Sequence, residues 1–506
     1  MEESKVEIIV GPPGTGKTET LLRRAEAMIS NGITPNRICF VTFTKKAALE
    51  AQTRAMEKFN LMPDDLPYFR TLHSLMFKEL ALARGSVLLI PDLLKICSLL
   101  GIAITLRSSD ITDGTFTGYK KGDKLFFLEN LARASCKSLK ETWESMPDLD
   151  VDFNELTLLR DTLLEYKRIN DKLDFTDMLT EFIRKEITVD IDALIVDEAQ
   201  DLSRAQWKVV DLLSKKPKVV IIAGDDDQAI FRWAGADINY FIDMPGKEVV
   251  LHKSYRVPAK IHEFASEMIK QVSHRRIKEW TPIEDKGSVN FCMSPDEIDM
   301  SKGTWYLLVR NRCFLYVFEE YCIRMGYSFL SIGDSPIADN CFKAVRDWER
   351  LRKDISMSVA DIRNIYNYMS VGNSLRHGAK AALSRADETI KLSLWDLRKT
   401  YGLAVETVWH EALDKLSARE REYFLTALKL GENLLKPPRI NINTIHGVKG
   451  GEADHVAVML DMTAMTHNEY MLNMDDETRV FYVAFTRARK TLNIIEPITN
   501  RYFRLT

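Results

Sequence analysis

Residues 6–18 read VEIIVGPPGTGKT, an apolar, β-branched run that leads into the pattern G-x-x-x-x-G-K-[ST]. The next stretch, residues 19–30, has a helical pattern, so the motif stands between a predicted strand and a predicted helix. In that context the glycines let backbone N–H groups surround phosphates at a helix N-terminus. The stretch therefore predicts a phosphate-binding loop after the first strand of a parallel α/β sheet.

The motif also predicts a role for each residue of the loop. Lys17 is expected to reach the β- and γ-phosphates of a nucleoside triphosphate, and the Thr18 hydroxyl to bind Mg²⁺. ATP and Mg²⁺ are the predicted cofactors. The other residues predicted to bind the nucleotide here are Gly11, Pro12, Gly14, Thr15, Gly16 and Glu19.

Working outward, strands alternate with helices in the first half of the chain. Further buried strands are predicted at residues 37–42, 191–197 and 218–224, and a helix at 47–59. This alternation is typical of a parallel α/β sheet. A mostly helical stretch interrupts it. The predicted boundaries are 1–83 and 176–248 for the first α/β core, and 84–175 for a helical insertion.

A second α/β pattern follows, with predicted strands at residues 305–309, 328–332, 440–444 and 455–460 and a helix at 315–325. A helical, charge-rich segment interrupts it and ends at Pro437 and Pro438. The predicted boundaries are 249–345 and 438–506 for the second core, and 346–437 for its short helical insertion. The fold class is α/β, with two parallel-sheet cores that are each split by helices.

Composition bounds the class of protein. The chain has 506 residues, of which 45% are hydrophobic and 28% charged, as in soluble globular proteins. Its seven cysteines form no Cys-x-x-Cys pair, and no apolar run is long enough for a membrane span. We expect a soluble cytoplasmic protein with no membrane partner. The net charge of −3 taken alone argues weakly against a nucleic-acid partner.

Polar residues that can take part in catalysis follow two further strands. Asp197 is placed to anchor Mg²⁺, and Glu198 to polarise the attacking water. Gln228 is placed to contact the γ-phosphate and report its loss. Phe231 and Trp233 follow closely and suit base stacking, which contributes about 1–3 kcal/mol per base.

Nine runs resemble the motifs of superfamily 1 DNA helicases of the UvrD/Rep/PcrA family, in the family's order. They are GPPGTGKT (11–18), VTFTKKAALEA (41–51), TLHSL (71–75), DFTDML (174–179), LIVDEAQD (194–201), GDDDQAIFRWAGA (224–236), SYRVP (254–258), INTIHGVKGGE (442–452) and ETRVFYVAFTRARK (477–490). The resemblance implies two RecA-like P-loop NTPase domains with parallel sheets, each interrupted by a mainly helical insertion. It also implies ATP hydrolysis at the cleft between these domains.

The resemblance assigns further nucleotide contacts. Tyr255 would stack on the base, and Glu452 would contact the ribose. Arg256, expected from the second core, and Arg487 would act as arginine fingers on the γ-phosphate. Two guanidiniums would neutralise the charge that develops on the transferred phosphoryl group.

The resemblance also places DNA across both cores. Hydroxyls and cations suit backbone phosphates, whereas aromatic rings suit bases. The residues implied are Thr42, Phe43, Thr44, His73, Phe231 and Trp233 on the first core, and Arg310, Arg312, Thr444 and His446 on the second.

The chain departs from the family pattern at three places. The family has a glutamine upstream of the phosphate loop that recognises adenine. No glutamine precedes Gly11 in this chain, so relaxed use of other nucleoside triphosphates is expected. The family has an arginine directly after this tryptophan, whereas here Arg232 precedes Trp233. The contact of the family's arginine is therefore not assigned to Arg232. The short second insertion and C-terminus leave little room for a strand-separating hairpin. Tyr502 and Phe503 are either a reduced wedge or a terminal core contact, and a compact phage or plasmid type of helicase is plausible.

The predicted function is an ATP-dependent single-stranded DNA translocase and helicase, 3′→5′ by resemblance, of the kind used in DNA repair and replication. Single-stranded and tailed duplex DNA are the expected partners, and the protein is expected to be a monomer. The alternatives are an RNA helicase, and a nucleic-acid-stimulated ATPase that remodels or switches binding with little unwinding. A chaperone-like AAA+ ATPase fits the later motifs poorly. Because the net charge is near zero, we expect charge segregation, with a positive channel across both cores and acidic outer faces.

Overall fold

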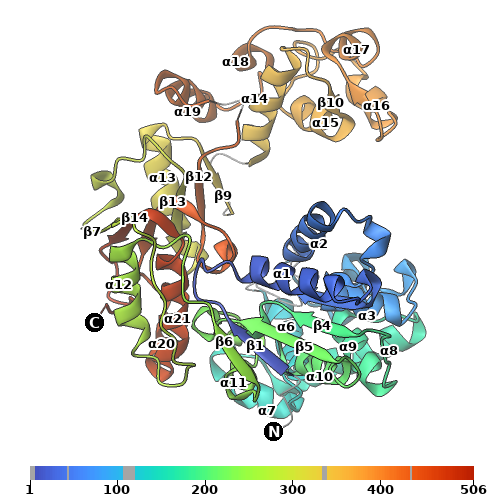
Figure 1. Ribbon diagram of the computed structural model, residues 1–506. Helices are drawn as coiled ribbons and strands as arrows, with labels where there is room; N and C mark the ends of the chain where they lie inside the picture. The colour runs from blue at the N-terminus through green and yellow to red at the C-terminus, as the bar shows by residue number, and fades with distance from the viewer. Residues whose placement is uncertain (1–5, 43–44, 106–119, 333–338, 434–435, 506) are drawn as a thin grey trace. The chain divides into compact units, whose positions relative to one another are not determined.

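The computed structural model describes residues 6–42, 45–105, 120–332, 339–433 and 436–505 (Figure 1). The chain forms two compact units. Unit 1 comprises Met1–Ala259, Ser266–Glu284 and Leu472–Tyr482, and unit 2 comprises Lys260–Ala265, Asp285–Met471 and Val483–Thr506. Each unit is described by itself below.

Unit 1 is built on a six-stranded parallel sheet with the strand order β3-β2-β4-β5-β1-β6. The strands are β1 (Val6–Val10), β2 (Ile38–Thr42), β3 (Phe69–Thr71), β4 (Ala193–Val196), β5 (Val219–Gly224) and β6 (Lys247–Val250). The sequence predicted β1, β2, β4 and β5, whose residues form continuous apolar runs because both faces of the sheet are covered. It missed β3 and β6, the two edge strands, which contain charged residues and show no continuous apolar run.

Helices cover both faces of this sheet, as Figure 1 shows. Ile9 of β1 packs with α1 (Lys17–Ser30) and α2 (Lys45–Phe59). Ile8 and Val10 point to the other face and pack with α3 (Leu72–Glu79), α9 (Phe175–Arg184) and α10 (Arg204–Leu213). The alternation of neighbouring side chains follows from the period of two along a strand. Unit 1 also holds α11 (Ile238–Asp243).

A helical insertion joins α3 to α9 and has a small core of its own. Its helices are α4 (Ile90–Leu100), α6 (Lys121–Ala134), α7 (Leu139–Glu144) and α8 (Phe153–Ile169). Short 3₁₀ helices complete the connections. In unit 1 they are η1 (Pro35–Arg37), η2 (Pro63–Asp65), η3 (Arg84–Ser86), η4 (Pro147–Leu149), η5 (Ala199–Asp201), η6 (Asp226–Gln228) and η7 (Arg232–Ala234).

Unit 2 has a second six-stranded parallel sheet, with the strand order β7-β14-β13-β8-β12-β9. The strands are β7 (Ser288–Cys292), β8 (Trp305–Val309), β9 (Phe329–Ser331), β12 (Ile440–Thr444), β13 (Ala453–Met459) and β14 (Ala488–Ile495). The connections include η8 (Pro295–Glu297), η9 (Arg312–Phe314), α13 (Leu315–Met325) and η10 (His446–Val448). Three helices, α12 (Ala259–Ile269), α20 (Ala464–Leu472) and α21 (Met474–Phe485), have residues in both units.

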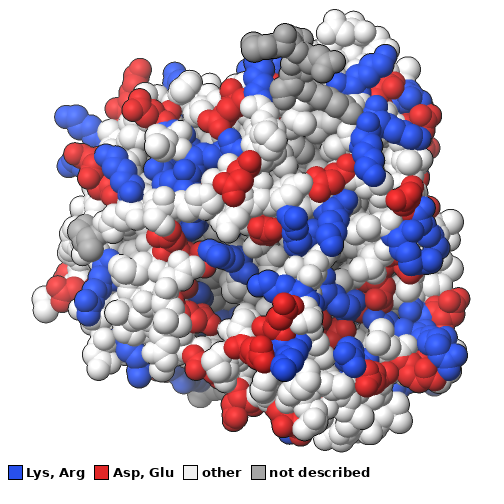
Figure 2. All heavy atoms as spheres, turned by 90° about the horizontal axis from the view of Figure 1, so that it is seen from below, with Lys and Arg blue, Asp and Glu red and all other residues white. Residues whose placement is uncertain are grey.

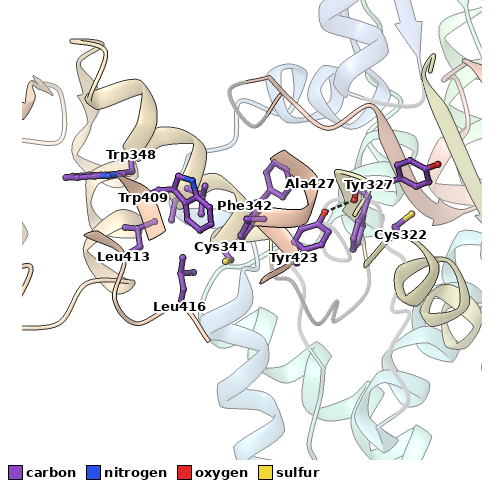
Figure 3. Packing of buried hydrophobic residues seen from close by; sticks show 14 of the residues in the cluster. Cys322, Tyr327, Cys341, Phe342, Trp348, Trp409, Leu413, Leu416, Tyr423 and Ala427 are labelled. Atoms are coloured by element: carbon purple, nitrogen blue, oxygen red, sulfur yellow. Dashed lines mark hydrogen bonds between the residues drawn. The ribbon is translucent and has the colours of Figure 1, made fainter. Parts of the chain in front are cut away.

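The insertion of unit 2 is mainly helical and shares one continuous hydrophobic core with the sheet domain. It contains α14 (Asp339–Leu351), α15 (Val359–Asn367), α16 (Ala379–Ser384), α17 (Leu394–Lys399), α18 (Trp409–Ala412), α19 (Ala418–Lys429) and the small antiparallel pair β10 (Met357–Ser358) and β11 (Lys391–Leu392). Figure 3 shows Trp348, Phe342 and Trp409 packed in this core. The Tyr423 hydroxyl donates to the Tyr327 carbonyl at 2.7 Å. The predicted α/β class with two helically interrupted parallel sheets is confirmed.

Phe503 is part of the core of unit 2. Its side chain is 2% exposed, its ring lies 5.5 Å from that of Tyr470, and its N–H donates to the Leu460 carbonyl at 2.9 Å. The sequence left two interpretations of Phe503, a reduced strand-separating wedge and a core contact. The structure supports the core contact.

The described surface mixes both signs of charge. Figure 2 shows one face, on which Lys and Arg side chains lie interspersed with Asp and Glu. The positive channel expected across both cores therefore stays a prediction. Across the residues that the structure describes, every helix is too short or too polar to span a bilayer.

Candidate functional site

The predicted catalytic side chains of unit 1 gather at one edge of its sheet. Strands β4, β5 and β1 are adjacent and parallel, so their carboxyl ends lie together. The phosphate loop follows β1, Asp197 and Glu198 follow β4, and residues 225–228 follow β5. Ligands of parallel α/β sheets bind outside this edge.

The backbone of the phosphate loop requires glycine at two positions. Gly14 and Gly16 both have a φ of +73°, in the left-handed region, and Gly16 is the N-cap of α1. Thr15 Oγ1 donates to the Pro12 carbonyl at 2.8 Å and braces the turn. The N–H groups of the first turn of α1 have no intrahelical acceptors, so the loop is suited to an anion.

Lys17 joins the loop to the end of β4. Its ammonium lies 2.7 Å from Glu198 Oε1 and 3.4 Å from Asp197 Oδ1. Burial disfavours the charged ammonium, but the two carboxylates outweigh it and hold the pKa of Lys17 well above its ordinary value. The side chain is therefore a fixed positive charge beside the loop.

Thr18 and Asp197 place two oxygen atoms that could bind a metal ion side by side. The Thr18 hydroxyl donates to Asp197 Oδ2 at 2.9 Å, and burial raises the pKa of Asp197. Among the described residues, no group of three or more His, Cys, Asp or Glu side chains could hold a metal ion. A hydroxyl and one carboxylate nevertheless fit Mg²⁺, which takes few protein ligands and completes its shell with substrate phosphates and water.

Glu198 is held in an uncommon backbone conformation. Its φ is +56°, and its N–H donates to Asp197 Oδ1 at 2.8 Å. Gln200 Nε2 donates to Glu198 Oε2 at 2.6 Å, and Gln200 Oε1 accepts the N–H of Asp225 at 3.0 Å. Gln200 thus links the loops after β4 and β5. Sequence reasoning gave it no role, although the run LIVDEAQD contains it.

Gln228 lies in η6, directly after β5. Its Nε2 donates to Asp225 Oδ2 at 2.6 Å. The side chain is half-buried. The amide is therefore oriented by a carboxylate on its own loop.

Residues 254–256 pack against the phosphate loop. The Tyr255 N–H donates to the Gly14 carbonyl at 2.8 Å, and Ser254 Oγ donates to the Pro13 carbonyl at 2.9 Å. A Cβ at Gly14 would lie 2.6 Å from Arg256 Cβ. These contacts assign Arg256 to unit 1, together with residues 249–259, whereas the sequence placed it on the second core.

The Tyr255 ring is an exposed aromatic surface beside α1. It is 68% exposed, and a Cβ at Gly16 would lie 3.9 Å from it. The Lys253 ammonium lies 5.8 Å from the ring centroid. An exposed ring held beside a phosphate loop is suited to stack on a base.

In unit 2, Arg487 and Glu452 precede β14 and β13 and so lie at the amino edge of the sheet. Arg487 is 2% exposed, and it donates through Nε to the Val483 carbonyl at 3.0 Å and through Nη1 to the Gly451 carbonyl at 3.2 Å. Glu452 pairs with Arg489 at 2.9 Å. The two predicted nucleotide contacts of unit 2 are thus neighbours.

The DNA candidates of unit 1 lie at the same edge as the nucleotide candidates. Thr42 ends β2, and no described residue hydrogen-bonds to its buried hydroxyl. The His73 ring meets that of Phe175 edge-on at 5.5 Å, and the Trp233 ring stacks on Phe127 at 6.3 Å. Phe231 is half-buried two residues before Trp233. Phe43 and Thr44 lie outside the described residues.

The DNA candidates of unit 2 lie at the carboxyl edge of its sheet, opposite Arg487. Arg310 follows β8, Thr444 ends β12, and the two strands are adjacent. Arg312 is in η9 and His446 is in η10. In unit 2, the residues predicted to contact nucleotide and those predicted to contact DNA therefore lie at opposite edges of the sheet.

Comparison with known proteins gives two family matches. Residues 2–247 match the UvrD/REP helicase N-terminal domain, and residues 350–497 match the UvrD-like helicase C-terminal domain.

Individual relatives match at low identity over much of the chain. A DNA helicase II homolog of Mycoplasma genitalium is 23% identical over 97% of this chain and 82% of its own length. The ATP-dependent DNA helicase Rep of Buchnera aphidicola is 24% identical over 96% of this chain and 88% of its own. The ATP-dependent DNA helicase PcrA of Bacillus subtilis is 26% identical over 67% of this chain and 50% of its own.

Proposed function

The chain belongs to the UvrD-like helicase family, and on that premise we propose that it moves along single-stranded DNA in the 3′→5′ direction. It is an ATP-dependent DNA helicase, as its relatives are. The single observation that carries the proposed ATP hydrolysis is the convergence of Lys17, Thr18, Asp197 and Glu198 at one edge of the sheet of unit 1, whereas the proposed direction rests on the family. ATP is hydrolysed at this edge.

Each residue of that group has a step in the reaction. Lys17 binds the β- and γ-phosphates, and in doing so exchanges its contact with Glu198 for the nucleotide. The released Glu198 carboxylate then accepts a proton from the attacking water. Thr18 and Asp197 would hold Mg²⁺, which neutralises phosphate charge when bound.

Tyr255 and Arg256 complete the proposed site from the segment that packs on the phosphate loop. Tyr255 stacks on the base and Arg256 faces the γ-phosphate, both carried on a segment that is hydrogen-bonded to Gly14. Gln228 orients the γ-phosphate. Arg487 of unit 2 is proposed as the second γ-phosphate arginine.

The DNA track runs over the carboxyl edges of both sheets. Thr42, His73 and Trp233 in unit 1 contact backbone and bases, and Arg310 and Thr444 in unit 2 contact phosphates. The proposed substrates are single-stranded and tailed duplex DNA, bound by a monomer. We propose DNA contacts also for Phe43, Thr44, Phe231, Arg312 and His446. Glu452 is proposed to contact the ribose.

A second candidate is a DNA-stimulated ATPase with little unwinding. The burial of Phe503 favours it, because this side chain belongs to the core and does not serve as a wedge. Such a protein would strip or remodel bound partners instead of separating strands.

Strand displacement on 3′-tailed and 5′-tailed duplexes tests these proposals, with Lys17→Ala as the inactive control. Displacement of the 3′-tailed duplex alone supports the helicase with 3′→5′ polarity, and displacement of the 5′-tailed duplex alone contradicts the polarity. ATP hydrolysis that DNA stimulates without displacement favours the second candidate. Stronger stimulation by single-stranded RNA than by DNA would contradict the DNA substrate.

A further inference from the structure

A buried lysine contacts three carboxylates of the loop that follows β5 in unit 1, residues 225–228, which also carries Gln228. The Lys278 side chain is 0% exposed. Its ammonium lies 2.9 Å from Asp225 Oδ1, 2.5 Å from Asp226 Oδ1 and 3.0 Å from Asp227 Oδ2. All three aspartates are fully buried, away from bulk water. Burying ions is costly unless each is paired, which makes the lysine essential to this arrangement.

Each aspartate has a different second partner. Asp227 forms a two-pronged pair with Arg275, and Asp226 Oδ2 accepts the N–H of Arg276 at 2.8 Å. Asp225 is the one of the three that binds Gln228: its Oδ1 faces Lys278, and its Oδ2 accepts Gln228 Nε2 at 2.6 Å. The carboxylate of Asp225 is thus held between the lysine and the glutamine.

Two separate segments of unit 1 hold this loop. Lys278 belongs to Ser266–Glu284, and Arg479 belongs to Leu472–Tyr482. Arg479 is 2% exposed, and its Nε donates to the Asp226 carbonyl at 3.0 Å. Its Nη2 donates to the His274 carbonyl at 2.6 Å, which joins the two segments. The loop that carries Gln228 is therefore fixed from β5, from residue 278 and from α21.

We propose that Lys278 is a positioning residue for ATP hydrolysis, which fixes the Gln228 amide through Asp225. The proposal rests on the proposed function, in which Gln228 orients the γ-phosphate. Lys278 itself touches neither nucleotide nor DNA. It acts by keeping one rotamer of Asp225, so that Gln228 is presented in one orientation in every turnover.

The variant Lys278→Met leaves three buried carboxylates with one cation and can fail to fold. The test therefore uses the double variant Lys278→Met/Asp226→Asn, which keeps the net charge of the cluster. The amide oxygen introduced at position 226 can still accept the Arg276 N–H. Asp225 keeps its bond to Gln228 but loses the lysine that orients it.

The measurements are kcat and KM of DNA-stimulated ATP hydrolysis, together with binding of a fluorescent ADP analogue. We expect kcat to fall tenfold or more, with KM and ADP affinity within threefold of wild type. We also expect Gln228→Ala to lower kcat by a similar factor and the combined variant to lose no more, because residues that act as a unit are non-additive. Lys270→Met, which removes an exposed lysine, should match wild type.

Three results would overturn the proposal: wild-type kcat in the charge-balanced variant, a loss that multiplies with that of Gln228→Ala, or a loss of ADP affinity equal to the loss of kcat. Failure of the proposed function is seen separately, because wild-type protein would then hydrolyse no ATP beyond the Lys17→Ala control.

Discussion

The ammonium of Lys17 lies 2.7 Å from the carboxylate of Glu198, although 181 positions separate the two residues in the chain. The contact joins the start of α1 to the end of β4. The contact places the proposed base beside the lysine that is proposed to bind the γ-phosphate, so binding of the nucleotide to Lys17 frees Glu198 to accept a proton from water.

Glu198→Gln should lower kcat of ATP hydrolysis by about 10²–10⁴-fold, because an amide cannot take a proton from the attacking water. Binding of ATP should remain, since Lys17 keeps its contact with Asp197. Steady-state hydrolysis and nucleotide binding measure the two effects. Glu284→Gln, at an exposed position, is the control. Activity within threefold of wild type would show that Glu198 is not the base.

Gly14→Ala should destabilise the phosphate loop. The left-handed φ of +73° costs a non-glycine residue about 1–2 kcal/mol, and the new Cβ would lie 2.6 Å from Arg256 Cβ. We expect the free energy of unfolding and the affinity for ADP both to fall. Gly32→Ala is the matched control, because its φ is +94° with nothing within 4 Å, so it carries only the conformational cost. Equal losses in the two variants would contradict the close packing of Arg256 on the loop.

Tyr255→Ala should weaken ATP binding by about 5- to 150-fold, because stacking on a base contributes about 1–3 kcal/mol. Tyr255→Phe should retain binding. The ring is 68% exposed, so urea unfolding should hardly change. Tyr316→Ala removes another exposed tyrosine, 49% exposed and distant in sequence, and should leave KM for ATP unaltered. A similar KM in all three variants would refute stacking on Tyr255.

Asp454 should stabilise unit 2 in a pH-dependent way. The N–H of Thr304 and the ammonium of Lys490 lower the pKa of Asp454 from 3.8 to about 2. A carboxyl group whose folded pKa is depressed stabilises the fold above the unfolded pKa, and that contribution is lost as the pH falls through the folded pKa. Asp454→Asn should therefore reduce stability to urea at pH 5–7.

The difference between wild type and Asp454→Asn should shrink as the pH falls from about 4 towards 2, because wild type loses this contribution there. Urea titrations at pH 7, 5, 4 and 3 measure it, with the exposed Glu320→Gln as the control. A difference that stays constant from pH 7 to pH 3 would assign the effect to packing.

Lys278→Met should lower the free energy of unfolding by about 3–5 kcal/mol, because it leaves buried carboxylates without their cation. Adding Asp226→Asn should recover part of the loss. Lys270 pairs with Glu267 at the surface, so Lys270→Met should change stability by about 0.5 kcal/mol or less. Denaturant unfolding of the three variants makes the comparison, and equal losses for the two lysines would contradict burial of the cluster.

The sequence by itself determined the elements whose cause is local. The apolar runs of β1, β4, β5 and β8 predicted buried parallel strands, and the glycine pattern at residues 11–18 predicted the loop that Gly14 and Gly16 form. The order of the motifs predicted two parallel-sheet domains with helical insertions. These features follow from side-chain periodicity and from the backbone freedom of glycine, which short stretches of sequence already carry.

The tertiary structure decided what depends on partners far along the chain. Strands β3 and β6 are the edge strands of their sheet and contain charged residues, so they show no continuous apolar run, and they form because a neighbouring strand supplies their hydrogen bonds. Arg256 belongs to unit 1 because the phosphate loop accepts hydrogen bonds from the residues beside it. The local sequence gives no sign that Lys278 is buried, because the three aspartates that surround it lie about 50 residues earlier in the chain. Pairings between distant residues are set by packing and by the cost of burying charge, and neither is written in local sequence.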